Sequence, residues 1–220
     1  MPFLASVTNT DATDGGNDEE TDDNYRERIR LVPESFSTAG CADGYIYWAK
    51  SASVDVGDVV VYSPVNDTTL SDEERQAGAG CVYIYILKKG GIIPEADDPL
   101  LQTVLSVVSA QDKRPLTDFV QVLPPSDVKY SIDLQYYISE DDRLNEADIT
   151  SAVNAAINEY ISWQGEKIGR DINPDKLRNL IYNAGASRVV MNSPTFTEIK
   201  RTQIASLEGE NSVRFAGFTE

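Results

Sequence analysis

The residues best equipped for chemistry form one acidic stretch near the start of the chain, TDGGNDEETDDNYRERIR, at positions 13–30. Carboxylates at this density could bind a cation. An EF-hand calcium loop needs oxygen ligands at alternating positions and a glycine at the sixth. Counted from Asp11, Gly16 falls sixth, but Thr13 and Gly15 occupy ligand positions and the twelfth residue is aspartate rather than glutamate. The match to a calcium loop is therefore poor.

The glycine pair Gly15 and Gly16 could instead belong to a phosphate-binding turn, but the surrounding carboxylates would repel phosphate. The pattern favours a tight turn that leads into a helix. We expect Asn17 to cap this helix and Glu20 to complete a capping box. Acidic residues fill its first turns and arginines its last, which suits the helix dipole, and Asp22 with Arg26 makes an i,i+4 pair.

Catalytic and metal-binding constellations are scarce elsewhere. Histidine is absent from the sequence, which removes Ser-His-Asp and Cys-His catalysis and most zinc chemistry. Cys41 and Cys81 fit no metal spacing. Cys41 lies near a predicted helix start, where a thiolate could be stabilised, but packing in the core is the simpler interpretation. We therefore predict a protein that is not an enzyme and needs no metal or cofactor.

Two further groups could form sites. Arg114 stands between Asp112 and Asp118 and could be clamped by both carboxylates, either as an active-site cluster or as a structural tie. The aromatic residues of the first half could form core and rim, or an interface patch, since tyrosine is enriched at interfaces. These are Tyr45, Tyr47, Trp48, Tyr62, Tyr83 and Tyr85.

The net charge of the chain limits the classes of molecule that it can bind. The 220 residues include 36 acidic and 19 basic side chains, a net charge of -17. Such a field repels nucleic acid and anionic lipid and favours cationic partners. The sequence has neither an apolar run long enough for a transmembrane helix nor a signal peptide pattern at its start. We expect no nucleic acid and no membrane partner.

The elements that would position these residues alternate between strands and helices. Helices are expected from position 17, from 37 or 38 to about 50, and over 97–111, 145–165 and 173–185; strands over 54–64, 80–89, 120–123, 126–139, 186–194 and 195–208, with a polar loop at 65–80. Asp98 and Asn173 are expected helix caps, each followed by proline, and Gly185 an expected stop. The pattern predicts an α+β fold with helices packed on mostly antiparallel sheets.

A Pro-Pro pair at 124–125 separates two apparently complete patterns of helices and strands. We therefore expect a connector at 1–14, a middle helical and strand domain at 15–124, and a C-terminal α+β domain at 125–220. Each of the two larger domains would be a small α/β-layered unit.

Four motifs in order resemble the baseplate J family, the wedge proteins of contractile phage tails and related injection systems. They lie at 15–29, 39–49, 112–122 and 168–189. The matching residues are Gly15, Gly16, Asp18, Glu19, Glu20, Arg26, Arg28, Gly40, Arg114, Pro115, Asp118, Gly169, Asp171 and Gly185. The resemblance implies that these are structural rather than catalytic positions. Family members usually carry a further domain ahead of the glycine pair, and the chain resembles a form without it.

The resemblance also implies a function. Members of this family are structural subunits that build the ring around the tail hub, associate with each other there, and contact a second wedge protein and a sheath-initiator protein. The expected location is the tail baseplate of the virion, or the bacterial cytoplasm during assembly. The alternative from the residues alone is a calcium- or small-ligand-binding module that uses the acidic segment Asp11–Asp23.

Overall fold

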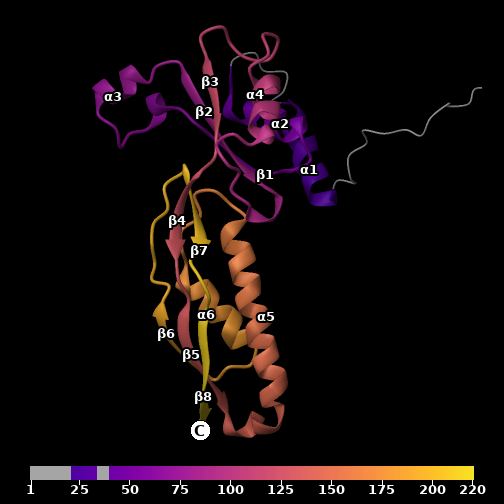
Figure 1. The fold of residues 1–220 in the computed structure, drawn as a ribbon, viewed down its shortest axis with the longest axis vertical. Coiled ribbons are helices and arrows are strands. Elements are labelled where there is room, and N and C mark those ends of the chain that lie inside the picture. Colours follow the sequence, from indigo (N-terminus) through magenta and orange to yellow (C-terminus); the bar gives the residue numbers. More distant parts are fainter. Residues whose placement is uncertain (1–20, 34–39) are drawn as a thin grey trace, which may run out of the picture.

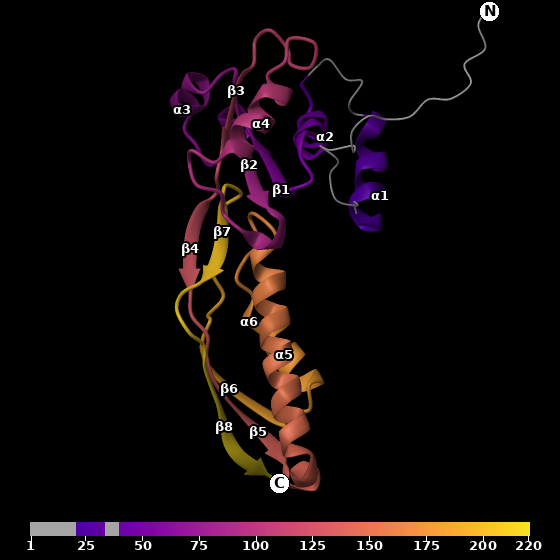
Figure 2. The same ribbon diagram turned by 45° about the vertical axis from the view of Figure 1, so that its right-hand side comes forward.

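The computed structural model describes residues 21–33 and 40–220. Its helices and strands form two halves arranged end to end along the long axis of the molecule, as Figures 1 and 2 show. The first half ends with the strand Phe119–Leu123, and the second begins with the strand Ser126–Tyr130. Helices pack on small sheets in both halves, which confirms the α+β class.

The first half is a three-stranded sheet covered on one face by two helices. Its strands are β1 (Val56–Tyr62), β2 (Cys81–Lys88) and β3 (Phe119–Leu123); its helices are α1 (Asp22–Leu31), α2 (Ala42–Ala52), α3 (Asp72–Ala77) and α4 (Pro99–Val108), with short 3-10 turns η2 (Pro64–Asn66) and η3 (Lys89–Gly91). The central strand β2 pairs with β1 antiparallel and with β3 parallel. Apolar side chains of α2 and α4, including Ala49 and Val104, pack on Ile84 and Ile86 to make the core.

Helix α4 follows its sequence signals closely. The Asp98 carboxylate accepts a hydrogen bond from the Leu100 amide at 3.0 Å, and Pro99 opens the helix. Leu100, Leu101, Val104 and Val108 are buried along one face of the helix, and Leu105 is half-buried. Capping and helical periodicity are local properties, so the chain itself specifies this helix.

The first two helices begin later than expected. Helix α1 starts at Asp22 because Thr21 is extended and its hydroxyl accepts a hydrogen bond from the Asn24 amide; the predicted cap at Asn17 lies outside the described residues. Helix α2 starts at Ala42 rather than at 37 or 38. Gly40 has a φ of 69°, a left-handed conformation that a right-handed helix cannot include.

The predicted polar loop at 65–80 contains a helix that the sequence interpretation missed. Helix α3 has a complete capping box, in which Ser71 and Glu74 exchange hydrogen bonds with each other's backbone amides. None of its residues is buried. An apolar stripe is therefore absent from this helix, and the capping box was its only local signal.

The second half packs two helices against its strands. The strands are β4 (Ser126–Tyr130), β5 (Asp133–Ser139), β6 (Arg188–Ser193), β7 (Gln203–Leu207) and β8 (Ser212–Thr219); the helices are α5 (Glu146–Gly165), preceded by η4 (Glu140–Asn145), and α6 (Pro174–Asn183). One sheet has the order β6-β5-β8, and β4 pairs with β7 separately. Buried side chains from both layers, among them Leu134, Ile157 and Leu177, form one core.

The structure corrects the strand assignments here. The single strand expected at 126–139 is two strands, which pair with different partners, and β8 was not predicted. The pairings are also more mixed than expected. β1–β2 and β5–β6 are antiparallel, whereas β2–β3, β4–β7 and β5–β8 are parallel. Strands that pair in parallel lie far apart in the sequence, so no turn motif between them indicates the pairing.

The two halves meet in a packed junction. Leu87 at the end of β2 is buried against Ile168 and Ile204 of the second half. The Ile168 amide donates a hydrogen bond of 2.9 Å to the Asp58 carboxylate of β1. An added Cβ at Gly91 would lie 2.5 Å from the carbonyl oxygen of Gly165, so η3 and the end of α5 approach closely. Apolar, polar and backbone contacts together join the halves.

Candidate functional site

Four of the motif residues come together in the first half, around the turn that leads into β3. Gly40 packs so closely on this turn that an added Cβ would lie 2.8 Å from both Asp118 Oδ2 and Pro115 Cγ. The Tyr45 hydroxyl donates a hydrogen bond of 2.7 Å to the same Asp118 oxygen. Arg114 donates to the carbonyl of Asp118 in the same turn. We call Gly40, Tyr45, Arg114, Pro115 and Asp118 the first clamp.

Arg114 ties the end of α4 to the following turn, but the suggested clamp between two carboxylates is wrong. Arg114 Nε donates to the Ser109 carbonyl at 2.9 Å, and its Nη1 donates to the Asp118 carbonyl at 2.6 Å. Asp112 is exposed, and within the described residues no ion pair joins Arg114 to either aspartate. A guanidinium group carries five hydrogen-bond donors in a fixed plane. It can therefore donate to several backbone carbonyls that are left unpaired at the end of a helix and in a turn.

The hydrogen-bonded pair of Tyr45 and Asp118 in the first clamp is suited to a structural role rather than to catalysis. Burial, together with the hydrogen bond to Asp118, raises the pKa of the Tyr45 hydroxyl well above its ordinary value. Tyr45 therefore stays protonated at neutral pH and donates permanently to the carboxylate. A phenol in this state cannot act as a general base.

Two more motif residues fix a loop of the second half, which we call the second clamp: Gly169, Asp171 and the loop that carries them. The Gly169 amide donates to the Gln203 carbonyl at 2.7 Å, and Gly169 itself has a φ of 73°. The Asp171 carboxylate accepts from the Ile199 amide at 2.8 Å. Gln164, fully buried on α5, donates to the carbonyls of Arg170 and Asp171.

Gly185 ends α6 as expected. Its φ is 106°, and its amide donates to the Tyr182 carbonyl while the Ala186 amide reaches back to Ile181. An added Cβ would lie 3.1 Å from the side chain of Ile149 on α5. The glycine thus supplies both a left-handed turn and a close approach between the two helices.

The motif residues on α1 are not part of either clamp. Arg26 pairs with Asp22 and Asp23 on an exposed surface, as the i,i+4 expectation required for Asp22. Arg28 lies over the Tyr25 ring. The remaining positions Gly15, Gly16, Asp18, Glu19 and Glu20 lie outside the described residues.

Sequence reasoning missed the polar residue that joins the two halves. Asp58 lies in an otherwise apolar run of β1 and accepts the Ile168 amide across the junction. Burial raises the pKa of its carboxyl, although the hydrogen bonds from Ile168 and Val59 and the nearby Lys50 oppose that shift. The available signal was a carboxylate within the run VGDVVVY, because a buried acid in an apolar strand needs a hydrogen-bond partner.

The predicted aromatic patch divides between core and surface. Tyr45 is buried in the core of the first half. Tyr62, Tyr83 and Tyr85 are half-buried on the sheet face opposite α2 and α4, where the Tyr62 and Tyr83 rings lie 6.3 Å apart. Burial and a hydrogen bond to Asp67 raise the pKa of Tyr62 to about 12, so its hydroxyl also remains protonated.

The chemistry available to these arrangements is structural. Across residues 21–33 and 40–220, no group of three or more Cys, Asp or Glu side chains is placed to hold a metal ion. In the same ranges no helix is both long enough and apolar enough to cross a membrane. Polar side chains of both clamps form hydrogen bonds with backbone groups and with one another, and these bonds fix the loops in position.

Comparison with known proteins agrees with this arrangement. Residues 37–124 match the model of the baseplate J-like central domain, and residues 132–210 match the model of the baseplate J-like protein C-terminal domain. Baseplate protein J of Escherichia phage P2 is 28% identical over 203 residues, which cover 91% of this chain and 61% of that protein. The chain thus spans about three fifths of that relative.

A solved structure shares the fold. One chain in the cryo-EM structure of the anti-feeding prophage baseplate, determined with 6-fold symmetrisation, superposes with a TM-score of 0.53 at 11% identity, covering 82% of this chain and 40% of that one. At this identity the likeness concerns the fold alone. The two domain models, which match in order along most of the chain, show that this protein belongs to the baseplate J-like family.

Proposed function

We propose that the chain is a structural subunit of a phage-tail-like baseplate wedge, which assembles into a ring around the tail hub. The observation that carries this proposal is the match of two successive baseplate J-like domains to one chain. Its partners would be other copies of itself, a second wedge protein and a sheath-initiator protein. Its place would be the tail baseplate of the virion, with the bacterial cytoplasm as the site of assembly.

The packed junction and the fixed loops suit a structural subunit that holds its neighbours at defined positions, rather than an enzyme. The two halves share buried apolar contacts through Leu87, Ile168 and Ile204, and Asp58 adds a hydrogen bond across the same junction. Each half also has a loop clamped by motif residues. A rod with a packed junction and fixed loops can present contact surfaces at defined spacing, and we propose that it has no enzymatic activity.

The tyrosine face of the first sheet is our candidate contact surface. Tyr62 and Tyr83 are half-buried there, on the side of the sheet that α2 and α4 leave uncovered, while the neighbouring Tyr85 packs on the junction cluster around Leu87. Tyrosine suits protein interfaces because it offers a large apolar area with a polar tip and few rotatable bonds. The acidic net charge would oppose self-association at low salt and favour a basic partner.

Sedimentation velocity tests the proposal. We expect the isolated chain to be monomeric or weakly dimeric at low salt, and to form a stable complex when a second wedge protein or a sheath-initiator homologue is added. A Tyr62→Ser/Tyr83→Ser variant should weaken that complex, whereas Tyr182→Ser on the exposed surface of α6 serves as the matched control. A chain that binds no baseplate protein at either low or high salt would contradict the proposal.

The alternative function is a calcium- or small-ligand-binding module that uses Asp11–Asp23, a segment that lies mostly outside the described residues. A ligand that binds only the folded state raises its stability. Thermal melts in EDTA and in millimolar calcium separate the two functions. A baseplate subunit should melt at the same temperature in both, while a rise of several degrees in calcium would favour the module.

The division into 1–14, 15–124 and 125–220 also remains a proposal. Limited proteolysis tests it. Cleavage at 123–127 or in the polar region 66–80, with a protected fragment from the second half, would support the division. A protected fragment that spans both regions would argue against it.

A further inference from the structure

Strand β3 forms one edge of the sheet in the first half. Among the described strands it pairs only with β2, in a sheet whose order is β1-β2-β3. The Phe119 amide donates to the Gly80 carbonyl on the β2 side at 2.7 Å. Backbone groups alternate in direction along a strand, so the amides and carbonyls of Val120 and Val122 point away from β2. This edge therefore offers backbone donors and acceptors to a further strand.

The devices that usually protect an edge strand from pairing are missing within β3. Such devices are charged side chains, prolines and β-bulges. The sequence of β3 is FVQVL, which contains neither a charge nor a proline, and the strand pairs with β2 in one unbroken register. Phe119, its first residue, is 63% exposed although it is a large apolar side chain. The edge is therefore suited to accept a strand.

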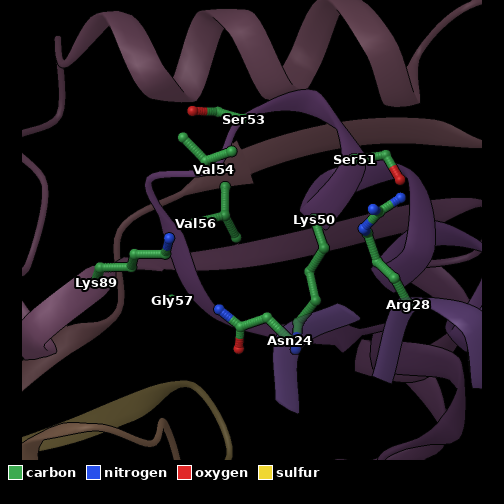
Figure 3. Close-up of a pocket in the computed structure, with 9 residues that line it drawn as sticks. All are labelled: Asn24, Arg28, Lys50, Ser51, Ser53, Val54, Val56, Gly57 and Lys89. Carbon is green, nitrogen blue, oxygen red and sulfur yellow. The ribbon is translucent and has the colours of Figure 1, made fainter. Parts of the chain in front are cut away.

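The other edge strands of the described residues differ from β3. The opposite edge of the same sheet, β1, has a break in register after Val56 and the carboxylate of Asp58, and its start lines a pocket of about 210 Å³ together with α1 and α2 (Figure 3). Strands β4, β6 and β8 each contain a charged residue. Strand β7 is uncharged, but its Gln203 carbonyl already accepts the Gly169 amide. Strand β3 thus has the least protected edge.

The sequence of β3 complements itself when two copies of the strand lie antiparallel. With the two-fold axis at Gln121, Phe119 of one copy lies opposite Leu123 of the other, and the two Gln121 amides face each other. Val120 lies opposite Val122 of the other copy, and their outward backbone groups can exchange two hydrogen bonds on each side of the axis. Aromatic, aliphatic and β-branched cross-strand pairs of this kind stabilise a sheet. The same patch on both copies makes an isologous contact.

Charge also favours this strand as the place where two copies meet. Each chain carries a net charge of -17, so two copies repel each other unless they meet where charge is sparse. Strand β3 has no charged residue. It leads through Pro124 and Pro125 into β4 along the long axis of the molecule (Figures 1 and 2). An antiparallel contact at β3 therefore directs the two second halves away from each other.

We propose that β3 pairs antiparallel with β3 of a second copy of this chain, so that the two three-stranded sheets become one continuous sheet. This inference deepens the proposed function and rests on it for the role of the pair, which would be a unit of the ring. A two-fold contact closes after two copies, so the ring also needs other contacts. Tyr62 and Tyr83 lie on the open face of the sheet and stay available for them. One short strand buries little area, so the pair is weak.

Sedimentation equilibrium of the full chain at low and high salt tests the pairing. We expect a weak dimer that becomes stronger as salt screens the repulsion between the copies. Gln121→Glu places two carboxylates opposite each other at the axis and should raise the dissociation constant about tenfold. The matched control is Gln102→Glu on the exposed surface of α4, which changes the net charge equally and should leave the dissociation constant unchanged. A chain that stays monomeric at high salt, or equal weakening by both variants, overturns the inference.

Amide hydrogen exchange of the unmodified chain provides a measurement that does not depend on a variant. Protection of the Val120 and Val122 amides should rise with protein concentration at high salt, whereas the Gln121 and Leu123 amides, which face β2, should be protected at every concentration.

Two outcomes of the exchange measurement contradict the pairing. One is a dimer in which the exchange of Val120 and Val122 is unchanged. The other is protection that arises only when another baseplate protein is added, which would assign the edge to that protein. Complexes with baseplate proteins that persist in Gln121→Glu would leave the proposed function intact even if the pairing fails. A chain that pairs with itself but binds no baseplate protein would contradict the proposed function and not the pairing.

Discussion

The two clamps perform the same task by different means. In the first, a side chain holds another side chain, since Tyr45 donates to the Asp118 carboxylate, and Arg114 adds hydrogen bonds to two backbone carbonyls. The absence of a side chain at Gly40 leaves space for Pro115. In the second, side chains hold backbone: Asp171 accepts the Ile199 amide and Gln164 donates to two carbonyls.

Their positions differ as well. The first clamp lies where the chain enters β3, at the end of that strand away from the second half. The loop of the second clamp also carries Ile168, which lies in the junction. We infer that the first clamp depends on close packing of its side chains and affects only its own half. The second clamp should tolerate changes of side chain better, but it is connected to the contact between the halves.

The largest effect is expected for Gly40→Ala, which should lower the free energy of unfolding by about 3 kcal/mol, because a left-handed residue gains a Cβ and that Cβ meets a proline ring. Gly209→Ala is the matched control, with the same φ of 69° and nothing within 4 Å of the added Cβ. It should cost only about 1 kcal/mol. Urea melts of both variants measure this, and equal losses would show that space at Gly40 does not matter.

A smaller effect is expected for Asp171→Ala in the second clamp. Loss of the acceptor for the Ile199 amide should cost about 1 kcal/mol, since the neighbouring backbone can recruit water at this exposed side chain. Asp171→Asn retains a carbonyl oxygen and should stay close to the parent. If urea melts show that Asp171→Ala loses more than Gly40→Ala, the ranking of the two clamps is reversed.

The junction should show a pH dependence set by Asp58. Burial raises the pKa of this carboxyl in the folded state, so between the unfolded pKa, about 3.9, and the folded value the folded state binds more protons. Its contribution to stability is present below the unfolded pKa and is lost as pH rises through the folded pKa. Asp58→Asn keeps an acceptor for Ile168 without this titration.

We therefore expect the stability of Asp58→Asn relative to the parent to improve from pH 4 to pH 7 in urea melts. Asp112→Asn, at an exposed position, is the control for general effects of removing a negative charge. A difference that moves the opposite way with pH would mean that the hydrogen bonds to Asp58, rather than its burial, dominate.

The smallest effect is expected for Arg26→Ala on α1. Its two ion pairs are exposed, with aspartate side chains 88% and 95% accessible, and such pairs contribute little because water screens them. Urea melts should overlay those of the parent. A clear loss of stability would show that this motif position is more than a surface pair.

Local signals in the sequence determined the elements that form within a few residues. Asp98 and Asn173 accept from the amides of their own first turns, and Gly185 ends α6, because caps and stops need only neighbouring backbone. Ile132, Leu134, Tyr136 and Ile138 alternate along the chain as the residues of one strand face do, and all four are buried. The α+β class followed from such signals taken in order. The family was indicated by the resemblance of four motifs, and the two domain models confirm it.

Tertiary structure decided what depends on distant partners. The contact of Gly40 with Asp118, the parallel pairing of β4 with β7, and the bond from Ile168 to Asp58 each join residues more than 70 positions apart. Strand β8 likewise forms only through its pairing with β5. Hydrogen bonding and close packing act over a few ångströms, so which residues they join is settled by the folded path of the chain, not by local spacing.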